Sequence, residues 1–573
     1  MREILARVCL QQPFLVLVNH FVKRLFASEE EQGGSTIGFG VGSVLALLAS
    51  PGAFASIFLM GKYSTLVAWI RGQHIDAIHR SPSDEYFFIV LSMTVTGLVM
   101  VSRWNRLFPN KRDFDNLAVL PIPIRNIFIA NLAALLGMAV LFGIDVNLVS
   151  SVLFPLFVAL NYETFSVFVH IAASHVTAVL MASFFSFFGV FALVGVLMLI
   201  TPRRLFPAVS LAFRVGLTVF LLAQFSSNVL LSLFAGRLPG QAGHFLRWVP
   251  SYWFLAIYES MLGFVKAPMA ELASVAGLAL AGAIVVSLVS YSLCYRRKFL
   301  RLTESSDSLA RVRRPRLSFP EKLAGVFFRS SFERACSMFT VKALFRSEAH
   351  LMFLGSYLGV GLVIVTGTAS GISTAAYGGP DADLLSIPLL IAFFVVSGLR
   401  FAFDIPAALS ANWIFRCTGD SQKPEPRAIA RRLMLAATVS WQILLLWPLT
   451  AMSYGLLLAS LHVGFVVSLT VLFTDVLLLQ FCKIPFTCST QFDIKRLSFR
   501  VVGAAFSVMF FVPMLAEGER WMLQNPVRST FVIILIAGAF YALRRYRRDM
   551  IQGDGEITFE DGPQPAFELL ILN

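Results

Sequence analysis

Twelve apolar runs, each about as long as a helix that crosses a membrane, divide this chain. A spanning helix needs about 20 consecutive, mostly apolar residues to cross the hydrocarbon core of a bilayer. The runs cover residues 38–60, 85–102, 127–158, 166–200, 205–234 and 268–295, and then 350–369, 385–404, 431–460, 463–482, 498–516 and 528–546. They predict an all-α polytopic membrane protein with about twelve transmembrane helices.

The composition excludes an ordinary soluble enzyme. Hydrophobic residues make up 57 % and charged residues 14 % of the 573 residues, and the mean hydropathy is +0.75. A soluble domain carries roughly 25 % charged residues, because its surface faces water. The net charge of +14 comes from basic residues that lie between the apolar runs. We therefore expect the lipid bilayer as a partner and no nucleic acid.

The basic residues also predict the orientation. With the N-terminus inside, the inside segments are 1–37, 103–126, 201–204, 296–349, 400–430, 483–497 and 547–573. With the adjoining helix ends they hold 38 of the 47 Lys and Arg residues, whereas the outside loops hold eight and Arg214 lies within a run. Cytoplasmic loops of membrane proteins carry such an excess of Lys and Arg. The pattern predicts a multi-pass protein of the plasma (inner) membrane with both termini in the cytoplasm.

The order of runs and loops is the same in both halves of the chain. This order predicts two tandem six-helix halves, related by an axis along the membrane normal. The predicted domains are an amphipathic interfacial helix in 1–37, a first half in 38–295, a basic cytoplasmic linker in 296–349, a second half in 350–546 and a cytoplasmic tail in 547–573. In the first of these, apolar residues alternate with basic ones, as in a helix that lies in the membrane interface.

The sequence lacks the motifs of nucleotide hydrolysis and of hydrolase or zinc chemistry. It holds no GxxxxGK[ST], in which backbone N–H groups and a Lys hold phosphates, and no GxSxG or HExxH. The glycine-rich stretch 33–43 lacks the Lys and opens an apolar run, so it is interpreted as a hinge. We expect no catalytic residue, no metal site and no cofactor bound by this chain.

Few ionisable residues fall inside the runs, and such residues are expensive in lipid and often functional. They are Asp145, His170, His175, Arg214 and Asp475. Asp145 and His170 fall near the outer ends and are expected to be wet. Arg214 and Asp475 fall in the inner halves of their runs, and we hypothesise that they face the protein interior and pair across the two halves.

The inside segment after the second run, residues 104–131, predicts a rigid lever on the cytoplasmic face. A turn at Pro109 precedes a short amphipathic stretch from Arg112 to Leu120. Pro121 and Pro123 end that stretch, because proline cannot continue a helix. The chain then enters the third run directly, so the short helix is tied to two spanning helices.

This segment resembles the coupling region of ABC-2 type exporter permeases, in which a charged pair, a Leu-rich turn, an L-P-I/V element and an Arg precede the third span. The matching residues are Arg112, Asp113, Leu117, Leu120, Pro121, Ile122, Arg125 and Ile127. The resemblance implies two copies of a separate ABC ATPase subunit as partners, with ATP bound there. The residues that it assigns to ATPase coupling in the first half are Trp104, Leu107, Phe108, Arg112, Asp113, Leu117, Leu120, Pro121, Pro123 and Arg125.

Two further segments are similar to parts of the same family. Residues 249–264 resemble the short re-entrant helices that the family places outside, before the sixth span, and the matching residues are Pro250, Trp253, Tyr258 and Glu259. In the second half, residues 403–432 keep Pro406, Trp413 and Arg416 but lack the L-P-I element. The resemblance implies a double-length permease of two fused halves, in which the second coupling site departs from the family pattern.

Three other functions stay open at this stage. A twelve-helix secondary transporter would need carboxylates near the bilayer midplane, which are scarce here. A membrane enzyme would need a catalytic His or a carboxylate pair, and Asp84 and Glu85 come closest. Together with Ser83, however, they begin a run and are interpreted as helix capping. The third is a non-transporting membrane partner of an ATPase. The leading prediction is an exporter subunit, for which an amphiphilic substrate suits an aromatic and apolar path.

Overall fold

The computed structural model divides into two compact units, residues 1–310 and 311–573. It describes residues 13–26, 41–63, 76–108, 117, 123–160, 162, 164–202, 205–234, 248–264, 269–294, 331–370, 381–405, 426–479, 481, 483–487, 503 and 507–551. Helices account for almost all of these residues, and the described part of the chain contains no strand.

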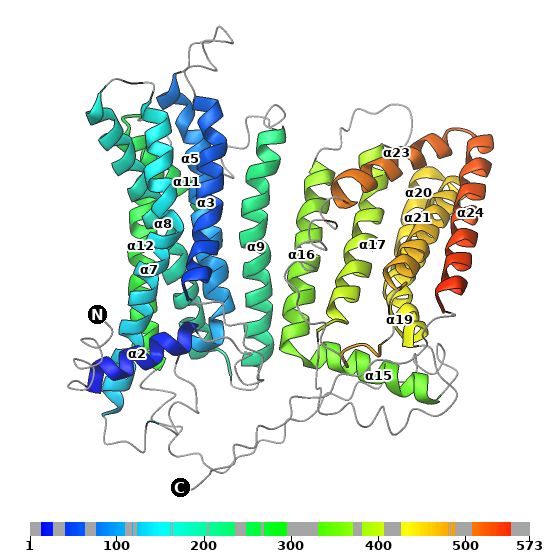
Figure 1. The fold of residues 1–573 in the computed structure, drawn as a ribbon, viewed down its shortest axis with the longest axis horizontal. Helices are drawn as coiled ribbons and strands as arrows, with labels where there is room; N and C mark the ends of the chain where they lie inside the picture. Colours follow the sequence, from blue (N-terminus) through cyan, green and yellow to red (C-terminus); the bar gives the residue numbers. More distant parts are fainter. Residues whose placement is uncertain are drawn as a thin grey trace. The chain divides into compact units, whose positions relative to one another are not determined.

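Unit 1 is a bundle of long helices with one short helix lying across one end. Its helices are α2 (Pro13–Phe26), α3 (Val41–Tyr63), α5 (Ala77–Ser102), α7 (Ile124–Ala159), α8 (Phe165–Ile200), α9 (Phe206–Phe234), α11 (Pro250–Met261) and α12 (Met269–Cys294). In Figure 1, α2 lies across the lower end of the bundle. We call the end of each unit that carries such a crossing helix its basic end.

Helix α8 forms the centre of unit 1 and packs against α5, α7, α11 and α12. Its approach to α12 is close, because a Cβ atom at Gly195 would lie only 2.2 Å from the Ser290 Oγ atom. Glycine allows such close packing of membrane helices, where van der Waals contact drives association. At the opposite end, a core cluster that includes Phe88, Phe154 and Tyr258 joins α5, α7 and α11.

The described helices of unit 2 follow a similar order, without a described counterpart of α9. Its helices are α15 (Ser331–Arg346), α16 (Glu348–Ser370), α17 (Ala382–Ala402), α19 (Pro426–Trp441), α20 (Trp447–Tyr454), α21 (Leu456–Leu477), α23 (Val512–Leu523) and α24 (Pro526–Ile551), with π-helical turns at Gln442–Leu446 and Ser507–Phe511. Figure 1 shows α15 across the lower ends of its neighbours, as α2 lies in unit 1. Helix α15 therefore marks the basic end of unit 2.

Short helices near the opposite end strengthen the parallel between the units. Helices α11 and α23 each have 12 residues, with a proline at the first or second position, and each precedes the last long helix of its unit. Helix α11 packs against α5, α8 and α12, and α23 packs against α17, α21 and α24, which hold the same places in unit 2. In Figure 1, α23 lies across the upper ends of its neighbours.

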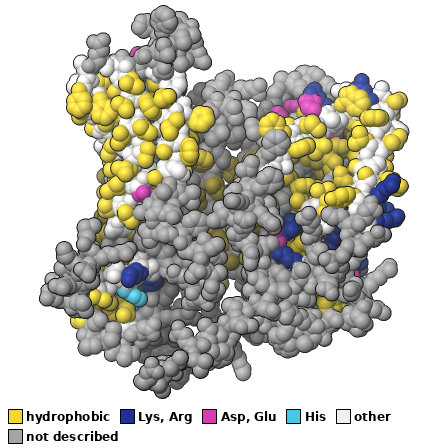
Figure 2. Space-filling model, in the orientation of Figure 1, with side chains coloured by type: hydrophobic (Ala, Val, Ile, Leu, Met, Phe, Trp, Pro, Cys, Tyr) yellow, Lys and Arg dark blue, Asp and Glu magenta, His cyan; other side chains and the backbone are white. Residues whose placement is uncertain are grey.

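The predicted all-α, multi-pass fold class agrees with the structure. Among the described residues, ten helices are long and apolar enough to cross a membrane, five in each unit. Exposed apolar side chains form broad surfaces on both units (Figure 2). Most lie on long helices, as expected for helices that face lipid.

Two details differ from the sequence predictions. Helix α5 begins at Ala77 and is capped by Asp76, whose side chain accepts a hydrogen bond from the His79 N–H group. Asp84 and Glu85 therefore lie inside the helix, and the capping interpretation is wrong. The helix starts early because residues 77–84, although polar in part, are held by contacts with α11 and with Tyr162: Ser81 accepts from the Tyr258 hydroxyl, and the Ile78 N–H group donates to the Tyr162 hydroxyl. The predicted linker 296–349 also contains α15, so its last part belongs to the packed structure of unit 2.

Candidate functional site

A turn directly after α5 forms the first candidate site, at the basic end of unit 1. The side chains of Trp104, Leu107 and Phe108 are buried there. The Arg24 guanidinium of α2 reaches the turn and donates hydrogen bonds to the carbonyl oxygens of Phe108, at 2.9 Å, and Arg106, at 3.3 Å. Arg106 in turn donates to the carbonyl oxygen of Arg24 at 3.2 Å. The crossing helix and the turn thus hold each other through reciprocal bonds.

Aromatic and amide groups fasten the same turn to three long helices. The Phe108 ring lies 5.7 Å from the Phe191 ring of α8 and 5.3 Å from the Tyr291 ring of α12. The Asn131 side-chain amide of α7 donates to the Leu107 carbonyl oxygen at 3.1 Å and to the Tyr291 hydroxyl at 3.0 Å. We call residues 24, 104–108, 131 and 291 the unit 1 joint. A displacement of this turn would move α2, α7, α8 and α12 together.

The predicted coupling residues of unit 1 separate into three groups. Trp104, Leu107 and Phe108 are buried, so their side chains hold the turn in place and present no surface to a partner. Leu117 is helical and half-buried, whereas Pro123 and Arg125, at the start of α7, are exposed. Arg112, Asp113, Leu120 and Pro121 lie outside the described residues.

The basic end of unit 2 holds the corresponding turn by charge. The Asp404 carboxylate, just after α17, lies 2.8 Å from both the Arg400 guanidinium and the Lys483 ammonium group. Burial acts to raise the pKa of Asp404, but the two cations outweigh it and hold that pKa below its usual range. Pro406, Trp413 and Arg416, predicted to couple this half, lie outside the described residues.

Near the opposite end of unit 1, α11 contains the four residues predicted for a re-entrant segment. Pro250 begins the helix. Tyr258 is buried and donates from its hydroxyl to the Ser81 Oγ atom at 2.9 Å, while Trp253 packs edge-on against a ring of α8. Glu259 is half-buried. The segment is thus a short helix anchored to the start of α5.

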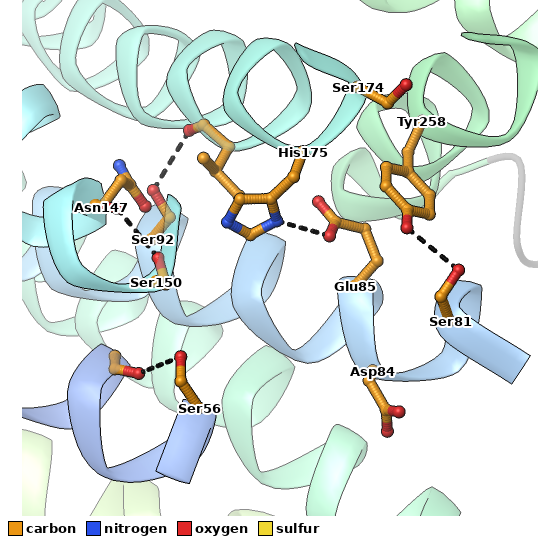
Figure 3. Close-up of polar contacts among 12 residues, drawn as sticks. Ser56, Ser81, Asp84, Glu85, Ser92, Asn147, Ser150, Ser174, His175 and Tyr258 are labelled. Atoms are coloured by element: carbon orange, nitrogen blue, oxygen red, sulfur yellow. Dashed lines mark hydrogen bonds and ion pairs between the residues drawn. The ribbon is translucent and has the colours of Figure 1, made fainter. Parts of the chain in front are cut away.

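Close to Tyr258 lies the second candidate site, a buried acid–imidazole pair (Figure 3). The His175 Nδ1 atom of α8 lies 2.6 Å from the Glu85 Oε2 atom of α5, and both side chains are 0 % exposed. The rings of Phe88 and Phe154 enclose the imidazole. Within the described chain, Glu85 Oε1 and His175 Nε2 have no hydrogen-bond partner. The carboxylate and the imidazole can share one proton. Each of the two side chains also carries a second polar atom, Glu85 Oε1 or His175 Nε2.

The neighbouring Asp84 serves a different purpose from Glu85. Figure 3 shows the two carboxylates on opposite sides of α5. Asp84 accepts hydrogen bonds from the Lys62 ammonium group, at 2.7 and 2.8 Å, and from the Tyr63 hydroxyl, so it fastens α3 to α5. Asp84 and Glu85 therefore do not form the carboxylate pair of an enzyme of the kind that the sequence left open.

A row of hydroxyl groups continues from the pair toward the middle of α5. The Ser92 and Ser183 hydroxyls lie 2.8 Å apart, and Thr96 lies 2.9 Å from the same Ser183 hydroxyl. The Asn147 amide of α7 donates to Ser183 at 3.3 Å. These bonds join three spans where a purely apolar packing would give less directional contact.

Unit 2 contains a second acid–imidazole pair. The His462 Nδ1 atom of α21 lies 2.5 Å from the Glu519 Oε1 atom of α23, and both side chains are almost fully buried. Burial raises the pKa of Glu519, although the hydrogen bond from His462 opposes this effect. As in unit 1, the histidine lies on the fourth long helix, in the half of that helix that is farther from the basic end.

Sequence reasoning identified only parts of these two pairs. It placed His175 inside a run and interpreted Glu85 as a cap, and it assigned no role to Glu519 or His462. The partners are 90 and 57 residues apart in sequence, so no local pattern could pair them. The available signal was a histidine in the fourth run of the first half and another directly before the fourth run of the second half, which lipid would disfavour without a partner.

Arg214 and Asp475, predicted to pair across the halves, belong to different units. Arg214 is buried on α9. The Asp475 carboxylate on α21 accepts two bonds from Arg431, at 2.6 and 3.1 Å, and the Arg427 guanidinium donates to its backbone carbonyl oxygen at 3.1 Å. Asp475 thus has partners within unit 2, and its pairing with Arg214 stays a prediction.

Comparisons with known proteins found no matching family model, no matching curated protein and no matching solved structure. Among the described residues, no group of three His, Cys, Asp or Glu side chains is placed to hold a metal ion. The function must therefore be argued from the geometry of the joint and of the buried pairs.

Proposed function

We propose that this chain is the membrane subunit of an ABC-2 type exporter, built from two six-helix halves with both termini in the cytoplasm. Separate ATPase subunits dock on residues 109–125 of the first half and on the corresponding segment of the second half. ATP binding to these subunits moves the unit 1 joint and the corresponding turn of unit 2. This movement switches the two halves between inward-facing and outward-facing states. An amphiphilic substrate leaves the cytoplasm along a path between them.

The unit 1 joint carries this proposal. An ATP-driven permease must convert a push at its cytoplasmic face into movement of several spans, and the driving contact must differ between the two states. The joint supplies a mechanical link of this kind, because one turn is fastened to α2 by Arg24 and to α7 and α12 by Asn131 and Tyr291. The exposed Arg125 lies at the start of α7, the helix that Asn131 joins to the turn.

The test is co-purification of an ATP-binding protein with the tagged full-length chain from its native membrane in a mild detergent. Asp113→Arg with Leu120→Asp should abolish co-purification, because it reverses a charge and adds another in the docking segment. The matched control is Glu517→Arg with Arg520→Asp, a swap of two exposed charges near the opposite end. The control should retain the ATPase. A wild-type chain that is monodisperse and never carries an ATPase would contradict the proposal.

A proton-coupled secondary transporter is the second candidate, and the two buried acid–imidazole pairs favour it. Each pair can share one proton between a buried carboxylate and an imidazole, and buried Asp, Glu and His side chains form the proton relays of such transporters. Proteoliposomes of the purified chain alone separate the two functions. An imposed pH gradient that drives substrate movement without ATP, lost in both His175→Gln and His462→Gln, would favour the secondary transporter.

A further inference from the structure

A cavity of about 340 Å³ opens between α19, α21 and α24 of unit 2. Its volume falls within the range of about 300–1,000 Å³ that is usual for small-molecule sites. Its lining includes Arg427, Arg431, Arg432, Asp475, Arg544 and Arg547. Five arginines therefore surround a single space at the basic end of the unit.

Among the residues that the structure describes, the lining of this cavity carries more positive than negative charge. Arginine stays protonated in proteins, so the lining carries five positive charges. Asp475 is the one carboxylate among the described lining residues, and Glu333 of α15 lies 2.8 Å from Arg432. Two carboxylates against five guanidinium groups leave a formal excess of three positive charges among the residues that the structure describes.

The arginines are arranged to converge on one ligand. Arg427 and Arg431 are four residues apart on α19, and Arg544 and Arg547 are three apart on α24, so each pair shares one face of its helix. Asp475 holds the Arg431 guanidinium in place through two bonds. Planar guanidinium groups from two sides suit a tetrahedral oxyanion, which accepts hydrogen bonds in all directions.

The surroundings of the cavity indicate where such an anion would come from. Higher on α24, Phe531, Ile533, Ile534 and Leu535 are exposed apolar side chains, as expected for a face in contact with lipid tails. The arginines follow at the basic end of the same helix. Figure 2 likewise shows dark-blue side chains beside the yellow surface of unit 2. Basic pockets between membrane helices at this level fit anionic headgroups.

We propose that this cavity is a binding site for a phosphate group, supplied by the headgroup of an anionic phospholipid whose acyl chains lie along α24. The guanidinium groups of Arg544 and Arg547 approach the phosphate from one side and those of Arg427 and Arg431 from the other. A bound headgroup would bridge α19 to α24 and add a contact that neither helix makes alone.

The test measures binding of dioctanoyl phosphatidylglycerol to the delipidated full-length chain in a neutral detergent, by native mass spectrometry and calorimetry. Dioctanoyl phosphatidylcholine serves as the uncharged comparison, and inorganic phosphate as the soluble source. Arg544→Gln with Arg547→Gln should weaken phosphatidylglycerol binding at least tenfold. Arg545→Gln with Arg548→Gln removes the same charge from exposed positions of the same helix outside the cavity, and should change binding less than threefold.

The outcomes separate the sources and the alternatives. Inorganic phosphate that binds with the same variant pattern, without a preference for phosphatidylglycerol, would support the phosphate site but assign it to a soluble compound. Arg544→Lys with Arg547→Lys keeps the charge and should retain binding better than the Gln pair. Retained binding would show that the helix tolerates substitution at both positions. Equal weakening by both Gln pairs, or by neither, would overturn the proposal. Binding that appears only after removal of residues 553–573 would also overturn the proposal. The acidic side chains of that segment would then occupy the cavity in the full-length chain.

Discussion

The basic ends of the two units hold equivalent turns with different chemistry. In unit 1 the turn after α5 is packed by Phe108 against two aromatic rings and is bonded by Arg24 to backbone carbonyl groups. In unit 2 the turn after α17 is held by Asp404 between two cations, and Asp475 gathers further arginines beside it. Aromatic rings pack both turns, since Phe403 lies against Phe481 and Phe486 in unit 2, but the unit 2 turn is in addition held by buried ion pairs at Asp404.

This difference predicts that the two basic ends respond differently to salt, pH and ligands. Aromatic packing is insensitive to salt and to pH near neutrality, so the unit 1 joint should transmit a mechanical displacement under all conditions. Ion pairs respond to salt, acid and anionic ligands, and buried ones become costly when one partner is removed. The packing at the basic end of unit 2 should therefore depend on salt, pH and bound anions. The predictions below test this contrast with variants in matched pairs.

The largest effect is expected from Phe108→Ala in the unit 1 joint. Removing a buried aromatic ring costs about 3–5 kcal/mol, because both the transfer free energy and the packing of the neighbours are lost. Thermal unfolding in detergent should show a clear fall in the midpoint that is the same at low and high salt. Phe58→Ala is the control, since the Phe58 side chain of α3 is 87 % exposed. Similar midpoints for the two variants would contradict a packed joint.

Next in size is Asp404→Asn, which leaves Arg400 and Lys483 partly buried without their carboxylate. We expect a loss of about 3 kcal/mol at neutral pH, because breaking a buried ion pair strands its partners. Since the folded pKa of Asp404 is lowered, its contribution is complete above the ordinary carboxyl pKa of about 4 and is lost as the pH falls through the folded value. Unfolding midpoints between pH 7 and pH 3 should fall less steeply in the variant than in the wild type. Parallel curves would contradict this role.

A smaller effect is expected for Asp475→Asn. Its partner Arg431 is 36 % exposed, so solvent screening reduces the loss to about 2 kcal/mol. The loss should shrink when salt is raised, unlike that of Phe108→Ala. Asp383→Asn, at an exposed position in the first turn of α17, is the control and should change the midpoint little. A salt-independent loss at Asp475 would remove the contrast between the two ends.

Much of the fold could be predicted from the sequence, because membrane-spanning helices are set by local hydrophobicity. Ten of the twelve predicted runs overlap helices that are long and apolar enough to cross a membrane. The run 38–60 overlaps α3, and the run 498–516 overlaps a π-helical turn and the start of α23. The failures concern short elements and long-range contacts. Helix α15 was missed because charged residues interrupt its apolar ones, so it forms no apolar run. The start of α5 was misplaced because residues 77–84 are held by contacts with Tyr162 and α11.

The candidate sites were less accessible to sequence reasoning. The segment around Trp104 was identified by its position between two runs and by its prolines, but burial of Trp104, Leu107 and Phe108 depends on α2 and α12. The arginine cavity combines residues from three helices, so the sequence presented its members only as basic residues at run ends. Spacing predicts which residues share a helix face, and only the packing brings several faces together.

The smallest effect, and the finest test of the contrast, is expected from Arg24→Gln on α2. The variant loses two charge-assisted bonds to the carbonyl oxygens of Arg106 and Phe108, but Phe21 and Leu25 stay buried beside it and keep the helix in place. We expect a loss of about 1.5 kcal/mol, the lower end of the net range for bonds made by a charged group. Lys23→Gln removes the same charge from the neighbouring exposed position and should have almost no effect on the unfolding midpoint. Equal losses in the two variants would mean that α2 is held by general attraction of its positive charge to its surroundings, in which case the basic end of unit 1 would depend on charge as unit 2 does.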